Sequence, residues 1–121
     1  MIQGFVSDFD EPIVEIDIKL SNEVSKKVVA IVDTGFNGYI SVPATLIEKT
    51  NWEFLGVEEY ELANGDVTEE KVYLGKVVFD GDELVVFALT NKSQDTLIGT
   101  KLLKGRILMV DFKAAKVVIQ K

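Results

Sequence analysis

Two residue types are missing from the sequence altogether, and each absence excludes a class of chemistry. The 121 residues include no cysteine, which excludes disulfides, thiolate metal sites and thiol nucleophiles. They include no histidine, which excludes Ser-His-Asp triads, Cys-His pairs and imidazole metal sites. Catalysis by this chain would have to use carboxylates, lysine, tyrosine, hydroxyl groups or the backbone. Carboxylates are plentiful, with 20 Asp and Glu residues.

Basic residues and long apolar runs are also scarce. The 13 Lys and Arg residues leave a net charge of −7, and such a surface repels nucleic-acid phosphates and anionic membranes. No segment approaches the roughly 20 apolar residues of a membrane span. The first twelve residues carry acids and lack the basic start and apolar run of a secretory signal. We therefore expect a cytoplasmic protein with no nucleic-acid or membrane partner.

The remaining composition predicts one all-β domain over residues 1–121. Hydrophobic residues make up 47% of the chain, which is enough for a core. Asn64-Gly65 and Asp80-Gly81 predict hairpin turns, the first of type I′, and Gly75 predicts a bulge in a long strand. Many short strands separated by turns favour a closed barrel or sandwich with one or two short helices. Strands are expected over 14–20, 27–32, 39–42, 57–62, 67–79, 84–89, 96–99, 107–110 and 117–119, and helical turns over 43–49 and 100–104.

The segment around Asp33 is the part of the sequence that suggests chemistry. The apolar run that ends at Val32 predicts a buried strand, and an acid, a small hydroxyl residue and a glycine follow it directly. Thr34 can form a hydrogen bond within the loop, and Gly35 lets the backbone turn and bring an amide close to the carboxylate. Asp33 could also be only a turn residue, because Asp and Gly are common in turns.

Three motifs along the chain resemble the retroviral-type (retropepsin-like) aspartic proteases. Asp33-Thr34-Gly35 after an apolar strand resembles their catalytic motif. Leu97-Ile98-Gly99, followed by a short helix, resembles the motif that closes their barrel. Leu62-Ala63-Asn64-Gly65 resembles the tip of the flap hairpin in bacterial and archaeal relatives. The resemblance covers residues from about 13 to 119, and an Asp-Thr-Gly-Phe sequence at residues 33–36 is typical of a small prokaryotic group.

The resemblance implies a fold and a reaction. The fold would be a closed acid-protease-type barrel, and this chain has the length of a single lobe. Two subunits would each contribute Asp33 across a two-fold axis, one carboxylate acting as base on a water and the other as acid toward the scissile carbonyl. Thr34 would brace the two loops, and Gly35 would donate its amide to the carboxylate. The expected activity is that of an aspartic-type endopeptidase on extended peptides, acting as a homodimer without a metal or an organic cofactor.

Four further residues are expected to contact the peptide substrate. Ala63, Asn64 and Gly65 would close over it as the flap, holding it by backbone hydrogen bonds. The fourth, Phe36, stands where the family usually has Ala or Ser. Its ring could narrow the cleft, form a specificity wall or block the substrate. We leave open whether the segments 1–6 and 117–121 interleave between subunits, as the chain ends of retroviral proteases do.

Two other classes of function remain open. The same barrel could hold a peptide without cutting it, as a binding or assembly module, and Phe36 is the feature that favours this. The chain could also be a monomeric structural domain whose apolar surface another protein covers. The acidic turns at 8–11 and 80–83 lack the ligand spacing of a calcium loop, so we interpret them as solvated. Trp52, Phe54 and Tyr60 could line a pocket, but we expect them to pack in or over the core.

Overall fold

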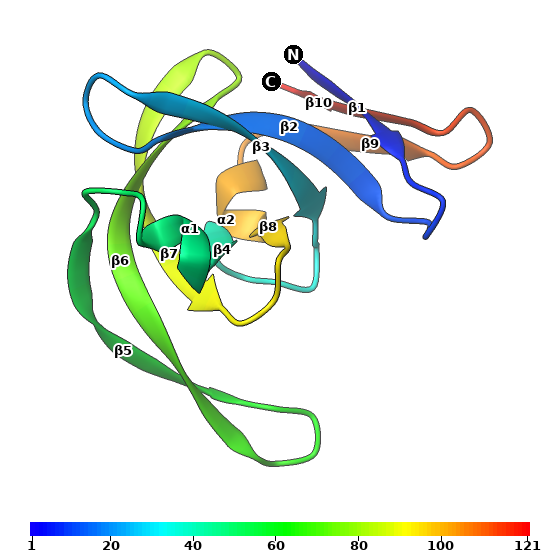
Figure 1. The fold of residues 1–121 in the computed structure, drawn as a ribbon. Helices are drawn as coiled ribbons and strands as arrows, with labels where there is room; N and C mark the ends of the chain where they lie inside the picture. The colour runs from blue at the N-terminus through cyan, green and yellow to red at the C-terminus, as the bar shows by residue number, and fades with distance from the viewer.

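Ten strands and two very short helices form along the chain (Figure 1). The computed structural model describes all residues, 1–121. The elements are β1 (Ile2–Val6), β2 (Pro12–Lys19), β3 (Ser25–Val32), β4 (Ile40–Pro43), α1 (Ala44–Ile47), β5 (Glu53–Glu61), β6 (Val67–Phe79), β7 (Asp82–Asn91), β8 (Thr96–Ile98), α2 (Thr100–Leu103), β9 (Ile107–Asp111) and β10 (Lys116–Gln120). The structure confirms the prediction of a mostly β chain with two short helices.

Six of the strands close into a mixed barrel. Their order is β2, β3, β8, β4, β7 and β6, and pairing of Asp17 with Val78 and of Ile18 with Val77 joins β6 back to β2. Two of the strand pairs are parallel, β3 with β8 and β4 with β7, while the others are antiparallel. Closure leaves none of the six strands with a fully unpaired edge, which protects their backbone groups from pairing with another chain.

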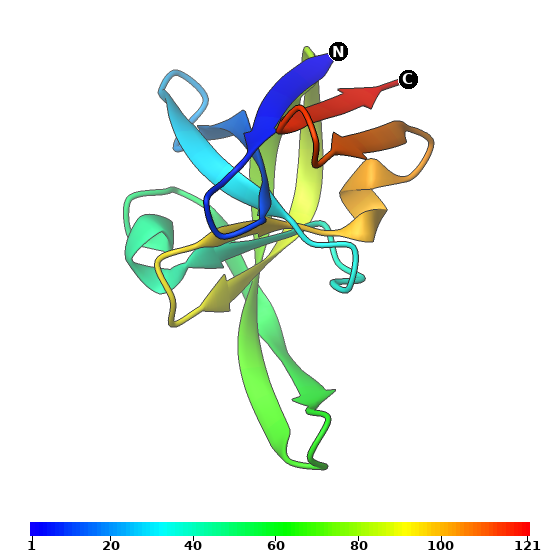
Figure 2. The ribbon, with the colours of Figure 1, turned by 90° about the vertical axis from the view of Figure 1, so that its right-hand side faces the viewer.

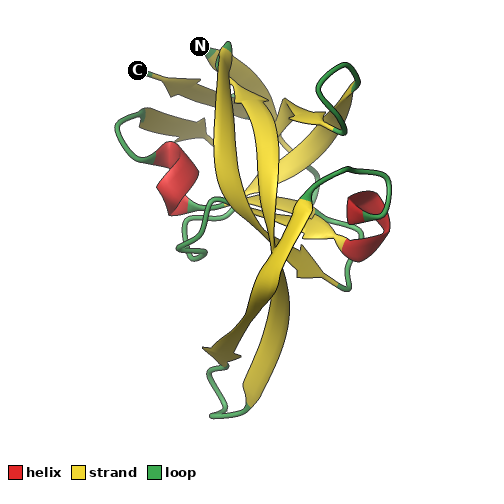
Figure 3. Cartoon of the chain, turned by 90° about the vertical axis from the view of Figure 1, so that its left-hand side faces the viewer, coloured by secondary structure: helices red, strands yellow, loops and turns green.

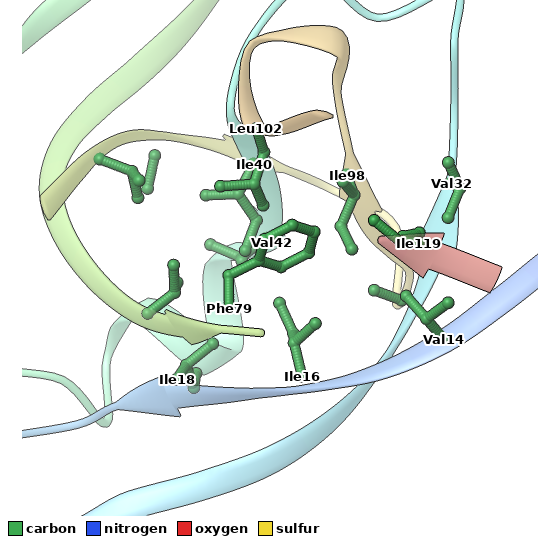
Figure 4. Packing of buried hydrophobic residues seen from close by; sticks show 14 of the residues in the cluster. Val14, Ile16, Ile18, Val32, Ile40, Val42, Phe79, Ile98, Leu102 and Ile119 are labelled. Atoms are coloured by element: carbon green, nitrogen blue, oxygen red, sulfur yellow. The ribbon is translucent and has the colours of Figure 1, made fainter. Parts of the chain in front are cut away.

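The barrel closes around a core of 17 buried apolar residues. In β2 the predicted alternation holds, because Val14, Ile16 and Ile18 point inward while Glu15 lies outside. Phe79 at the end of β6 is fully buried and lies among the inward-pointing side chains of the other strands (Figure 4). Burial of a large apolar side chain contributes roughly 1.5–3 kcal/mol to folding. The core includes Val32 at the end of β3 and Ile98 at the end of β8, so it holds both strand ends in place.

Two extensions leave the barrel in different directions. On one side, β1, β10 and β9 continue the sheet from β2, so both chain ends pair with each other inside one subunit (Figure 2). On the other, β5 pairs with the first part of β6 and forms a hairpin that stands away from the barrel (Figure 3). We refer to residues 53–71 as the projecting hairpin.

Several local predictions were wrong. The turn at Asn64-Gly65 is not of type I′, because only Gly65 has a positive φ (+88°). The type I′ signature of two positive φ values occurs instead at Asp80 (52°) and Gly81 (82°). β6 also runs through Gly75 without a break. The irregularity lies in β5, between Phe54 and Gly56, and Gly75 makes room for the ring of Trp52, which a Cβ there would approach to 2.9 Å.

Exposure and pairing also differ from expectation in three places. The apolar run of β3 is buried on one face only, and Val29 is 61% exposed because its outer side faces solvent. Phe54 lies on β5 and is half exposed rather than packed in the core. The segment Ile2–Val6, which was not predicted as a strand, forms β1 by pairing with β10. Long-range pairing, not local pattern, produces this strand.

A network of ion pairs joins the β6–β7 turn to Arg106 and to the N-terminal amino group. Arg106 donates to Asp80 at 3.0 Å and lies 3.7 Å from Asp82, and its guanidinium stands 4.8 Å from the centre of the Phe79 ring. The N-terminal amino group also bonds Asp80. That bond, followed by the charges of the amino group, Arg106 and Lys121, holds the pKa of the Asp80 carboxyl below its usual value.

We expect Asp80→Asn to lower Tm at pH 7. A lowered pKa in the folded state means that the Asp80 carboxylate stabilises the fold above its unfolded pKa of about 4 and that this contribution disappears as pH falls through the folded value. Asn tolerates the left-handed backbone, so the change isolates the charge. The difference in Tm between wild type and variant should therefore shrink below about pH 4. Thermal unfolding followed by circular dichroism from pH 2.5 to 8 measures this.

Asp8→Asn is the control, because Asp8 is exposed and forms no ion pair or side-chain hydrogen bond. It should leave Tm almost unchanged throughout. A Tm difference for Asp80→Asn that is absent at pH 7, or equally large at pH 3, would contradict the role of the carboxylate.

Candidate active site

Asp33 stands at the point where β3 leaves the barrel wall. Its N–H donates to the carbonyl oxygen of Ile98 on the neighbouring β8 at 2.9 Å. Its carbonyl oxygen accepts from the N–H of Phe36 at 3.1 Å, which closes the turn. One carboxylate oxygen, Oδ1, accepts from the N–H of Gly35 at 2.9 Å, and the side chain makes no other hydrogen bond. The turn thus orients a half-buried carboxylate and leaves its second oxygen free.

Gly35 leaves room for the Asp33 carboxylate. A Cβ at position 35 would lie 3.2 Å from Oδ1 of Asp33, a close approach that glycine avoids. Thr34 is exposed and its hydroxyl has no partner within the chain. The structure therefore brings Asp33, Thr34 and Gly35 together in one tight loop.

The segment from Ile98 to Lys101 holds this loop in place. The N–H of Thr100 donates to the carbonyl of Phe36 at 2.8 Å, and the N–H of Lys101 donates to that of Gly38 at 3.1 Å. Gly99 lies so close that a Cβ there would stand 2.2 Å from the Gly38 oxygen. The Leu97-Ile98-Gly99 motif thus supports the Asp33 loop through backbone contacts that only glycine permits.

A shallow hollow of about 500 Å³ opens beside Asp33 and Thr34. Leu97 of β8 and the exposed Phe112 add apolar surface to it, and Glu11 and Asp95 add two further carboxylates. No hydrogen bond joins Asp33 to another carboxyl group of its own chain. The hollow can therefore admit a polar group and apolar side chains, but a single subunit holds no hydrogen-bonded carboxyl pair.

Phe36 lies on the other side of the loop. A Cβ on Gly38 would come within 2.5 Å of the Phe36 ring, so the ring rests on that glycine. It lines a second hollow, of about 230 Å³, with Tyr39, Tyr60 and Phe87, and it does not line the first. The ring therefore lies outside the hollow beside Asp33.

The tip of the projecting hairpin lines neither hollow. Ala63, Asn64 and Gly65 are exposed, and the side-chain oxygen of Asn64 accepts from the N–H of Asp66 at 3.0 Å. This bond and the left-handed Gly65 shape a three-residue loop. The tip stands clear of the Asp33 loop, so the two predicted parts of the site are not in contact within one subunit.

Sequence reasoning did not single out Tyr39, Glu58 and Phe87, which line the second hollow, and it assigned Tyr60 to packing. The hydroxyl of Tyr60 donates to Glu58 at 2.6 Å. Partial burial, and then this bond and the charge of Glu58, raise the pKa of Tyr60 well above its usual value, so the phenol stays protonated. Glu58 and Tyr60 have i, i+2 spacing on a strand, which places both side chains on one face. This spacing could have predicted from the sequence that the two side chains are neighbours.

Comparisons with known proteins identified no related family. Neither the protein-family models nor the curated proteins include a significant match to the chain. No group of three or more carboxylates converges in a way that could bind a metal ion. Neither helix has the length and apolar composition needed to cross a lipid bilayer.

Proposed function

We propose that this chain is an aspartic-type endopeptidase of the retroviral type, active as a homodimer on extended peptides. The observation that supports the proposal is the Asp33 turn: a half-buried carboxylate, with one oxygen bound to the Gly35 amide and the other free, beside an open hollow. A carboxylate held in this way is prepared for proton transfer without further reorganisation. On this hypothesis the barrel is a single acid-protease-type lobe.

The reaction needs two copies of Asp33. One carboxylate takes a proton from a water, whose oxygen then bonds to the scissile carbonyl carbon, while the other carboxyl group gives its proton to the carbonyl oxygen. The carboxyl group that took the water proton then gives it to the leaving nitrogen, while the other carboxylate takes a proton from a hydroxyl group of the intermediate. The C–N bond breaks, and an amine and a carboxylic acid are released. The pair titrates as a unit, so activity should have a bell-shaped pH dependence. Thr34, exposed and without a partner, is available to brace the second subunit.

Dimerisation is the first requirement to test. We expect sedimentation equilibrium between about 5 and 200 μM to show a reversible monomer–dimer equilibrium, because the exposed ring of Phe112 and the partly buried Leu97 and Leu108 line the Asp33 hollow. A variant with Phe112→Ser should dissociate at higher concentrations than wild type. Val24→Ser changes an exposed apolar side chain on the β2–β3 turn that does not line that hollow, so it should behave as wild type. A strict monomer over the whole range would exclude the paired Asp33 site.

The alternative is a module that binds peptides without cleaving them. It is favoured by Phe36, whose ring rests on Gly38 next to the Asp33 loop and lines the second hollow. A pepstatin-type transition-state mimic distinguishes the two, because an active pair should bind it and raise Tm, whereas a subunit with one carboxylate should not. Cleavage of a peptide library by wild type, compared with Asp33→Asn, then tests the chemistry itself.

A further inference from the structure

A groove runs between the projecting hairpin and the outer face of β7. It consists of two adjoining hollows of about 230 and 200 Å³ that share Glu58 and Phe87. The first is the one lined by Phe36, Tyr39 and Tyr60, and the second adds Leu55 and Val57 of β5. The groove therefore offers apolar and aromatic walls on one side of the Asp33 loop.

One carboxylate interrupts these walls. Glu58 is exposed and lines both hollows, and the Tyr60 hydroxyl donates to its Oε2 at 2.6 Å, which fixes its position among the rings. Aromatic faces attract cations, and a carboxylate binds a guanidinium or ammonium group through charge-assisted hydrogen bonds. Lys and Arg combine an apolar stem with such a head, so their chemistry matches these walls.

The charge of the whole molecule is concentrated on the same hairpin. Residues 53–71 carry seven carboxylates and one lysine, a net charge of −6 out of −7 for the chain. Two glutamate pairs, Glu58 with Glu70 and Glu59 with Glu69, stand directly opposite each other across β5 and β6. Like charges in such positions destabilise a hairpin, and a bound cation would relieve the repulsion.

We propose that this groove binds a cationic extended peptide, with a Lys or Arg side chain lying on the aromatic rings and its head at Glu58. Charge complementarity identifies the occupant: an acidic hairpin over an apolar groove selects a positively charged peptide and repels an acidic one. The proposal names the substrate class of the endopeptidase and rests on that function in assuming that the peptide is a substrate.

Lys101 is the one basic side chain that lines the groove. Its Nζ lies 5.8 Å from the centre of the Tyr39 ring, at the end of the groove formed by α2. Its positive charge repels a second cation at that end. The head of the bound Lys or Arg side chain therefore lies beside Glu58. Lys101→Gln should therefore strengthen binding of a cationic peptide.

The test uses the full chain carrying Asp33→Asn, so that peptides bind without being cut. Three fluorescein-labelled decapeptides share an extended framework of Val, Ala and Phe and differ only in carrying three Arg, three Gln or three Glu residues. Fluorescence anisotropy should show the Arg peptide binding about tenfold tighter than the Gln peptide, with the Glu peptide weakest. The preference should shrink at 0.5 M salt because screening weakens it.

Glu58→Gln and Glu59→Gln form a matched pair of variants. Each removes one charge and relieves one glutamate pair, but adjacent strand residues face opposite sides, and only Glu58 lines the groove. Affinity for the Arg peptide should fall about tenfold in Glu58→Gln and less than about threefold in Glu59→Gln. Equal losses in the two variants, equal affinity for the three peptides, or no binding at all would each overturn the proposal.

Failure of this proposal and failure of the catalytic one are distinguishable. Affinity is measured on a variant that cannot use Asp33, whereas cleavage is measured on wild type with the same three peptides. Selective binding of the Arg peptide without cleavage by wild type would refute the peptidase and leave the groove assignment standing. Cleavage of all three peptides at equal rates would support the peptidase and refute the preference of the groove for a cationic peptide.

Discussion

Replacement of Asp33 by Asn should reduce kcat/KM for peptide cleavage by about 10³-fold, because proton transfer to and from the reacting groups is lost. The fold should survive, since the side-chain oxygen of Asn can still accept the Gly35 amide that Oδ1 accepts in wild type. We expect the free energy of unfolding to change by less than about 0.5 kcal/mol. Digestion of a peptide library, read by mass spectrometry beside thermal unfolding, measures both quantities.

Asp95→Asn is the matched control for this prediction. Asp95 lines the same hollow and carries the same charge, but its carboxylate has no hydrogen-bond partner that would orient it. Its replacement should change kcat/KM by less than about fivefold if only Asp33 transfers protons. An equal loss in both variants would indicate that the two carboxylates of one chain act together, and the requirement for a homodimer would then be wrong.

The sequence predicts the barrel strands well because each carries its own pattern. The alternation from Val14 to Ile18 and the Asp80-Gly81 turn are local signals, and the structure confirms both. β1 has no such signal and forms only because β10 lies beside it. A bulge was expected at Gly75 in the long strand 67–79, but Gly75 makes room for the Trp52 ring, and the register shift lies in β5 between Phe54 and Gly56. The sequence does not reveal whether a glycine in a strand serves its own backbone or a distant ring.

Some residues of the candidate site could be predicted from local sequence, and others could not. The residues of the Asp33 turn follow one another in sequence, so their proximity was predictable. The groove combines Phe36 from a loop, Glu58 and Tyr60 from β5, and Phe87 from β7. Their proximity depends on barrel closure and on the way β5 folds over β7, which no local pattern encodes. Tyr60 alone suggests a core residue, and only its bond to Glu58 shows that it lines an open hollow.

The second large effect is expected for Gly99→Ala. The backbone of Gly99 has φ −100°, so an alanine is not strained there by its own conformation. The added Cβ would instead stand 2.2 Å from the Gly38 oxygen and 2.7 Å from the Phe36 oxygen, and both are backbone atoms already bound to α2. Such atoms cannot move without breaking those bonds, so we expect a loss of about 3 kcal/mol. For a chain of this length, Tm should fall by roughly 10 °C.

Gly105→Ala separates this steric effect from the general cost of replacing a glycine. Gly105 has φ +81° and open space around it, so its replacement costs only the left-handed conformation, about 1 kcal/mol. Amide chemical shifts of residues 33–39 provide the second readout: Gly99→Ala should displace them, whereas Gly105→Ala should leave them in place. Equal destabilisation by the two variants would mean that Gly99 does not support the loop. A selective effect of Gly99→Ala would show that β8 and α2 set the geometry of the Asp33 turn, because the atoms nearest to the added methyl group are the carbonyls of that loop.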